Sequence, residues 1–78
     1  MEYPLSERVQ LGDQVLIDSS HKGVVVANIE DKEFSEAYPA KDWAHLEKGV
    51  LIDTDFGGLI HYDKEALETD HVRLSSRN

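Results

Sequence analysis

Short runs of β-branched and aliphatic residues, broken by glycine, aspartate and serine, dominate the pattern of this chain. The run Val24–Ile29 has four β-branched residues in six positions, a composition that favours extended strands. In an earlier run, Val15 and Ile17 occupy alternate positions, which is the period of a strand with one buried face. The runs that predict strands are 11–18, 24–29, 50–54, 59–62 and 71–74. Segments of this kind predict a small all-β domain.

The domain has to be stable without disulfides, because the chain has 78 residues and no cysteine. A domain of this size buries roughly 60% of the surface that its unfolded chain exposes, so its core is small. We expect residues 1–10, of mixed polarity, to form an N-terminal arm and residues 11–78 to form the domain. The predicted core residues are Val15, Ile17, Val24, Val26, Ile29, Leu51, Ile60 and Val72. A small core and uncovered strand edges also favour self-association, so a homodimer is a further expectation.

The stretch Asp53–Asp63, DTDFGGLIHYD, contains fragments of several functional motifs. A kinase-type Asp-Phe-Gly needs a phosphate loop, a strand lysine and a catalytic-loop aspartate, for which this chain has no room. A calcium loop that starts at Asp53 would place Lys64 where a bidentate acid is required. The four histidines are spread singly along the chain, which is not the spacing of a metal site. No metal site is therefore predicted.

The same stretch is predicted to form a β-hairpin, because Gly57 and Gly58 supply the backbone freedom of a tight turn. Neighbouring strand residues point to opposite faces, so His61 and Tyr62 cannot enter one pocket. We expect Ile60 and Tyr62 to point inward and His61 to be exposed, because burying an ionisable side chain is costly.

Sixteen acidic and eight basic residues give a net charge of −8. Binding to a nucleic-acid backbone requires clustered lysine and arginine, so nucleic acid is not an expected partner. The chain has no run of about 18 apolar residues and no N-terminal charged-then-apolar segment. We therefore expect a cytoplasmic protein that does not bind membranes.

The long segment between the second and third predicted strands concentrates aromatic residues among acids. It contains Phe34, Tyr38 and Trp43, and its acids include Glu36 and Asp42. Asp42 is expected to cap a helical turn over residues 42–48, which Gly49 ends. Two interpretations remain open, because these rings either close one end of the core or form an exposed binding site.

Three short motifs resemble the SH3-like small barrel, including its KOW and Tudor-type modules. They are Leu11-Gly12-Asp13-Gln14-Val15 at the first strand, Gly23 before the valine run, and Ala66-Leu67-Glu68 before the last strand. The resemblance covers residues 11–74 and implies a five-stranded barrel with one long loop insertion and a single helical turn before the fifth strand. In combination with these motifs, the stretch Gly49–Tyr62, GVLIDTDFGGLIHY, is also similar to short uncharacterised bacterial proteins, some of them encoded on mobile gene cassettes.

One SH3-like family, the plasmid-borne type II dihydrofolate reductases, is enzymatic. The chain resembles it in the Gly-Asp-x-Val opening and in the turn that ends at Glu68. From that family's working strand, Val-Gln-Ile-Tyr, only the tyrosine has a counterpart, at Tyr62. A chain of net charge −8 would also repel an anionic dinucleotide.

These observations favour a non-catalytic, acidic binding module that recognises a basic protein or peptide. The predicted binding residues are Phe34, Glu36, Tyr38, Asp42 and Trp43. No catalytic residue and no cofactor are predicted, because the chain lacks a Gly-x-Ser-x-Gly elbow and a thiol nucleophile. The alternative is an oligomeric barrel that binds a small molecule, or acts as a small enzyme, through a pocket between subunits.

Overall fold

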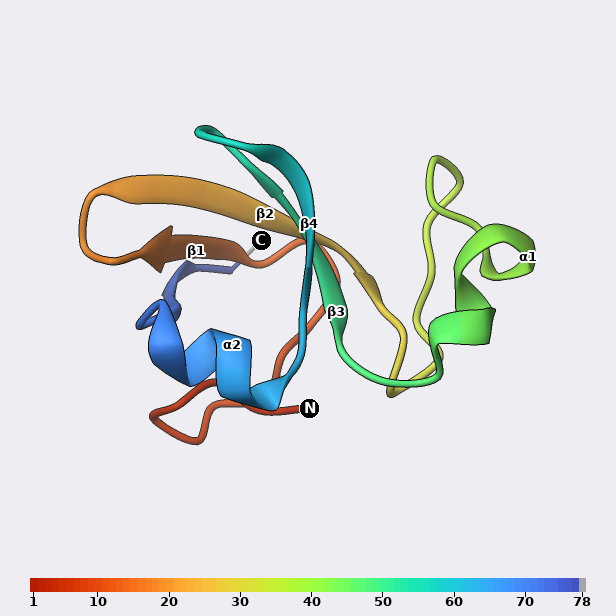
Figure 1. The fold of residues 1–78 in the computed structure, drawn as a ribbon, viewed down its shortest axis with the longest axis horizontal. Coiled ribbons are helices and arrows are strands. Elements are labelled where there is room, and N and C mark those ends of the chain that lie inside the picture. Colours follow the sequence, from red (N-terminus) through yellow and green to blue (C-terminus); the bar gives the residue numbers. More distant parts are fainter. Residues whose placement is uncertain (78) are drawn as a thin grey trace.

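A computed structural model describes residues 1–77 and shows five antiparallel strands in one open sheet (Figure 1). The order of the strands across the sheet is β4-β3-β2-β1-β5. The strands are β1 (Gln14–Ile17), β2 (His21–Asn28), β3 (Val50–Thr54), β4 (Gly58–Tyr62) and β5 (Arg73–Ser76). The helical elements are α1 (Ala40–Trp43), the 3₁₀ turn η1 (Ala44–Leu46) and α2 (Lys64–Thr69). The predicted set of five strands with a short helix before the last is confirmed.

Within residues 1–77, no helix has the length and apolar character needed to span a bilayer.

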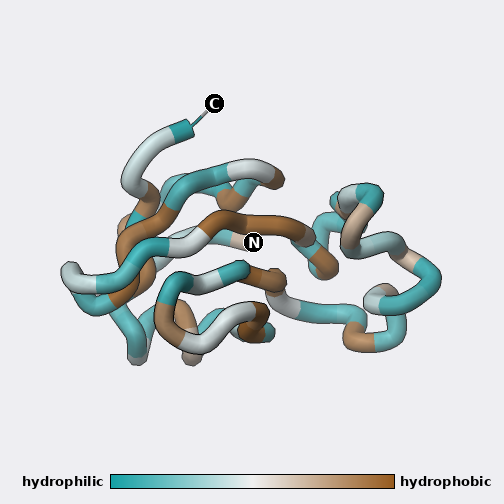
Figure 2. The backbone as a smooth tube through the Cα atoms, turned by 90° about the horizontal axis from the view of Figure 1, so that it is seen from above, coloured by the Kyte–Doolittle hydropathy of each residue, from teal (hydrophilic) through white to brown (hydrophobic). Residues whose placement is uncertain are grey.

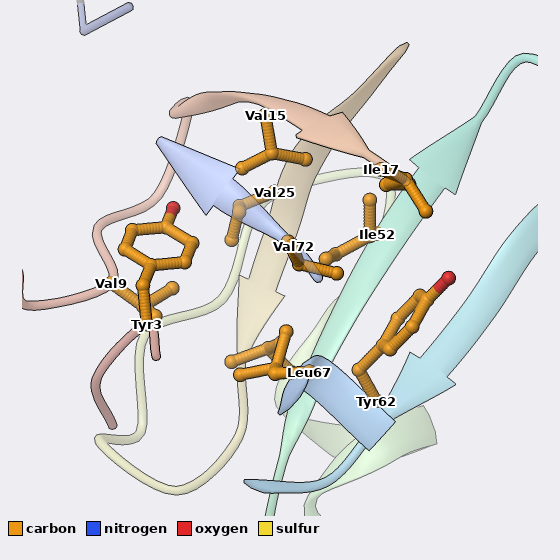
Figure 3. Close-up of a cluster of buried hydrophobic side chains, with 10 residues drawn as sticks. Tyr3, Val9, Val15, Ile17, Val25, Ile52, Tyr62, Leu67 and Val72 are labelled. Carbon is orange, nitrogen blue, oxygen red and sulfur yellow. The ribbon is translucent and has the colours of Figure 1, made fainter. Parts of the chain in front are cut away.

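The main core lies on one face of the sheet and is closed by α2 and by the N-terminal segment (Figure 3). Asp63 starts α2, because its side chain accepts a hydrogen bond of 2.7 Å from the backbone N–H of Ala66. Leu67 then points into the core from the middle of this helix. The buried members of this core are Tyr3, Val9, Val15, Ile17, Val25, Val50, Ile52, Tyr62, Leu67 and Val72.

The predicted phase of β2 is wrong. Val24 is 39% exposed and Val26 is half-buried, whereas Val25 and Ala27 are fully buried. Gly23 sets this phase, because a Cβ atom there would lie 2.6 Å from Cγ2 of Ile52 in the core. Three valines in a row carry no period-two signal, so the sequence pattern could not decide which of them faces inward.

The other predicted core positions agree with the structure. Val15, Ile17, Ile29, Leu51 and Val72 are buried. A sixth position, Ile60, is half-buried and packs against the main core.

The segment 1–10, predicted as an arm, packs on the sheet and supplies Tyr3 and Val9 to the core. Its backbone folds back on itself, since Tyr3 N–H donates to the carbonyl of Glu7 and Val9 N–H donates to that of Met1.

The predicted hairpin is confirmed, with Thr54 of β3 opposite Gly58 of β4. The Thr54 hydroxyl donates to the carbonyl of Gly58 and accepts from the N–H of Gly57, which fixes the turn. The predicted facing of β4 is also confirmed, because Tyr62 is buried and His61 is exposed. The His61 ring lies against the end of the loop that leads into β3, with its Nε2 atom 2.8 Å from the carbonyl oxygen of Lys48.

Candidate binding surface

Residues 29–49, between β2 and β3, form a separate lobe at one end of the molecule (Figure 1). Both ends of this lobe are tied together at its base. Asn28 and Glu33 exchange two backbone hydrogen bonds, of 2.7 and 2.9 Å. The carbonyl of Gly49 accepts hydrogen bonds from the N–H groups of Ile29 and Glu30. Backbone hydrogen bonds therefore fix the position where the lobe leaves and rejoins the sheet, although the lobe contains little regular structure.

The predicted helical turn lies inside the lobe but begins two residues earlier than expected. The α1 helix starts at Ala40, with Pro39 at the N-cap position. Asp42 therefore lies in the first turn of α1, and its predicted role as the cap is wrong. Its carboxylate remains well placed there, because negative charge near a helix N-terminus is favourable.

A second hydrophobic cluster joins the lobe to the opposite face of the sheet from the main core. Its buried members are Ala27, Ile29 and Leu51. Ala27 belongs here because the register of β2 on β3 shifts between Val25 and Ala27, which moves its side chain to the second face. The partly buried residues packed on this cluster are Val26, Phe34, Tyr38, Trp43, Leu46 and Leu59.

The three aromatic rings of the lobe are neither fully buried nor free. Phe34, Tyr38 and Trp43 are all half-buried, and each packs against the second hydrophobic cluster. The Tyr38 and Trp43 rings lie 6.3 Å apart between centroids and are tilted by 51°. Packing therefore orients these rings while leaving part of their surface for contact with another molecule.

The lobe also carries more acidic than basic residues, six against three lysines within residues 29–49. Glu36 and Asp42 are exposed, and within residues 1–77 neither forms an ion pair. Glu33 is half-buried, and its Oε1 atom is buried without a hydrogen-bond partner in the described part of the chain. Figure 2 shows the lobe at the right as a mainly hydrophilic segment with short hydrophobic stretches, in contrast to the sheet.

Two hollows found in the described residues 1–77 are not lined by the aromatic rings of the lobe, although the first is bordered by Glu30 and Asp31 at the base of the lobe. One, of ≈ 540 Å³, lies between the N-terminal segment and α2 and includes Tyr3, Arg8 and Lys64. The other, of ≈ 510 Å³, lies on the outer face of the sheet and includes Lys22 and Asp53.

A buried polar network was not foreseen from the sequence. Asp13 is fully buried, and its carboxylate accepts hydrogen bonds from the Tyr3 hydroxyl at 2.7 Å and from the Gln10 N–H at 2.9 Å. Arg77 donates to both oxygens of this carboxylate, at 2.9 and 3.2 Å. The Arg77 side chain also donates to the carbonyl of Arg8. The network fastens the segment after β5 to the N-terminal segment.

The pKa values in this network follow from burial and charge. Burial alone would raise the pKa of Asp13, but the hydrogen bonds from Arg77, Tyr3 and Gln10 outweigh it and hold the pKa below its usual range. Burial, followed by the hydrogen bond to Asp13, raises the pKa of Tyr3. On the other side of the core, burial and the hydrogen bond to Asp70 raise the pKa of Tyr62 to about 12. The network is therefore structural, with Asp13 charged and both tyrosines protonated at neutral pH.

Acid is expected to weaken the fold through Asp13. Its pKa is depressed in the folded state, so its contribution to stability is present above the unfolded-state pKa of about 3.9 and is lost as the pH falls through the folded-state value. Chemical denaturation between pH 2 and pH 6 should show the loss below about pH 4. Asp13→Asn should flatten this dependence, whereas Asp53→Asn, at an exposed carboxylate without an ion pair in residues 1–77, should not. An unchanged slope in Asp13→Asn would contradict this role.

A last group of side chains, His21, Asp55 and Phe56, joins the tips of the two hairpins. The rings of His21 and Phe56 lie 4.6 Å apart, and His21 Nδ1 lies 3.4 Å from a carboxylate oxygen of Asp55. Within residues 1–77, no three residues of the His, Cys, Asp and Glu types come together as a metal site would require.

The sequence-predicted binding residues thus fall into two sets. Phe34, Tyr38 and Trp43 share one hydrophobic cluster, and Glu36 and Asp42 are exposed on the same lobe.

Searches against protein-family models, curated protein sequences and solved structures found no match for this chain.

Proposed function

We propose that this chain is a non-catalytic interaction module of the SH3-like barrel class, which acts in the cytoplasm and binds a basic protein or peptide through its lobe. The observation that carries this proposal is that Phe34, Tyr38 and Trp43 are half-buried together in one cluster. The same lobe carries the exposed acids Glu36 and Asp42, which form no ion pair within residues 1–77. The five antiparallel strands and the helix before β5 support the barrel class.

Rings and carboxylates attract the same ligand. The face of an aromatic ring carries negative quadrupole charge, so a lysine or arginine side chain above it gains about 0.5–2 kcal/mol. A nearby carboxylate adds a charge-assisted hydrogen bond to the same group. Arginine fits both features best, because its planar guanidinium stacks on a ring and pairs with a carboxylate at its edge.

The net charge of the chain affects the rate at which a charged ligand associates with it. A net charge of −8 on 78 residues attracts a cationic partner and repels an acidic one. The association rate should therefore fall with ionic strength, while the dissociation rate depends mainly on the ring contacts.

Substitution of the two clustered rings tests the proposal. Binding kinetics of a defined basic peptide, acetyl-Arg-Val-Arg-Val-Arg-amide, should show faster dissociation for Tyr38→Ala and for Trp43→Ala. Loss of one cation–ring contact corresponds to a change of about twofold to thirtyfold. Phe56→Ala is the matched control, because Phe56 is an exposed ring (49%) that lies outside the lobe.

The acids are tested by charge neutralisation without a change of shape. Glu36→Gln with Asp42→Asn should slow association at low salt, whereas Glu65→Gln with Glu68→Gln, on the exposed side of α2, should change it less. Circular dichroism has to show that each variant is folded. Folded ring variants that bind the peptide as the parent does would overturn the proposal, and so would a peptide that binds neither the parent nor any variant.

A further inference from the structure

The β4 strand is an edge of the sheet that lacks the usual protection against strand addition. Natural sheet edges are commonly blocked by lysine, proline, a bulge or a covering segment. The sequence of β4 is Gly-Leu-Ile-His-Tyr, which has neither lysine nor proline. All five of its residues pair with β3 in continuous register, without a bulge. In the described residues 1–77, no backbone-to-backbone hydrogen bond joins residues 58–62 to a segment other than β3.

The opposite edge, β5, also lacks lysine and proline but differs in length and in register. It has four residues and begins with the exposed Arg73. Its register on β1 shifts between Gln14 and Val15, and a shift of this kind twists an edge away from further pairing. Of the two edges, only β4 pairs in continuous register, and its residues from Gly58 to His61 are exposed or half-buried, whereas Tyr62 is buried.

The two faces of β4 differ in chemistry. Leu59 and His61 lie on one face, opposite Asp53 and Leu51 of β3. On this face Leu59 packs against the second hydrophobic cluster, which also holds the three rings of the lobe. Ile60 and Tyr62 share the other face, where Ile60 is half-buried against the main core. A strand added along β4 would alternate its side chains between these two faces, because neighbouring residues of a strand point in opposite directions.

We propose that β4 is a strand-addition site for an extended segment of a basic partner, in which basic and apolar residues alternate. This inference rests on the function proposed above, since it takes the lobe as the contact for the basic side chains. Residues opposite Leu59 and His61 project on the lobe side, toward the rings and the exposed Asp53. The residue between them lies opposite Ile60 and covers its exposed part. Backbone pairing with β4 supplies affinity, and the alternation supplies selectivity.

Two N-methylated forms of the peptide Arg-Val-Arg-Val-Arg separate backbone pairing from side-chain binding. An added strand turns the N–H groups of every second residue toward β4 and the others toward solvent. N-methylation of one alternate set, either the arginines or the valines, should therefore weaken binding by more than about tenfold, through lost hydrogen bonds and steric blocking. N-methylation of the other set should leave binding nearly unchanged, which makes each peptide the control for the other.

Hydrogen exchange of the parent protein gives an independent readout of the same edge. The unmodified peptide should slow exchange of amides within residues 58–62, and the inactive methylated peptide should not. If the two methylated forms bind equally well, the strand-addition site is wrong while the binding lobe stands. If the unmodified peptide does not bind at all, the proposed function itself fails. If residues 58–62 are instead protected in a concentration-dependent dimer that the peptide does not displace, a second copy of the chain occupies this edge and the inference is overturned.

Discussion

Replacing Val25 by aspartate is expected to unfold the protein or to leave it barely stable. Val25 is 1% exposed within the main core, and an unpaired charge at such a position is among the most damaging single changes. A domain of 78 residues is stabilised by about 4–12 kcal/mol, and the loss should reach about 4 kcal/mol or more. Urea denaturation followed by circular dichroism measures it.

The neighbouring valine provides the control for this change. Val24 is 39% exposed on the other face of β2, so Val24→Asp should cost no more than about 1 kcal/mol. Similar losses for the two variants would mean that the phase of β2 differs from the one described, and with it the whole side-chain arrangement of the central strand.

Replacing Gly49 by alanine should have the second large effect, and it would act on the base of the lobe. Gly49 has a φ of +86°, and a Cβ atom there would lie 2.6 Å from both the His61 ring and the carbonyl oxygen of Tyr62. The backbone oxygen cannot move away without disturbing the pairing of β3 with β4. The left-handed conformation costs alanine about 1–2 kcal/mol, and overpacking adds about 1–3 kcal/mol.

Gly12→Ala separates these two contributions. Gly12 has a φ of +87°, and nothing lies within 4 Å of a Cβ atom built on it. This variant should therefore show the conformational cost alone, about 1–2 kcal/mol. Equal losses of unfolding free energy at positions 12 and 49 would show that the close approach of Gly49 to β4 is not as described.

The hairpin over residues 53–63 was predictable because its signals are local. Gly57 and Gly58 mark the turn, and the alternation from Ile60 to Tyr62 identifies the buried face, which the structure confirms. The phase of β2 was not predictable in the same way, because three consecutive valines satisfy either face equally. The deciding contact, between Gly23 and Ile52, joins residues that are far apart in the sequence.

The N-terminal segment shows a second limit of local reasoning. Nothing in residues 1–10 marks Tyr3 as a core residue. Its hydroxyl donates a hydrogen bond to the buried Asp13, whose carboxylate also accepts from Arg77 near the other end of the chain. The sequence pattern places Asp13 in a motif that opens a strand, whereas in the structure it is the buried centre of a polar network. A pattern of hydrophobic residues cannot reveal a carboxylate that is buried with its partners.

The binding residues of the lobe could be predicted from the sequence only in part. Composition alone identified Phe34, Tyr38 and Trp43 as a group, and the structure places all three in one cluster. Composition could not show whether the rings are core or surface, because both interpretations use the same residues. The half-buried position of each ring combines the two, since packing on Ala27, Ile29 and Leu51 orients rings that remain accessible.

The fluorescence of Trp43 is the most direct test of the lobe as a binding surface, because it is the single tryptophan of the chain. Titration with acetyl-Arg-Val-Arg-Val-Arg-amide at low salt should produce a saturable change in its emission, and the apparent Kd should rise with added salt. The peptide Glu-Val-Glu-Val-Glu, of equal length and opposite charge, should produce none. A Trp43 emission that stays unchanged with the basic peptide, or that responds equally to both peptides, would contradict a cation-binding lobe.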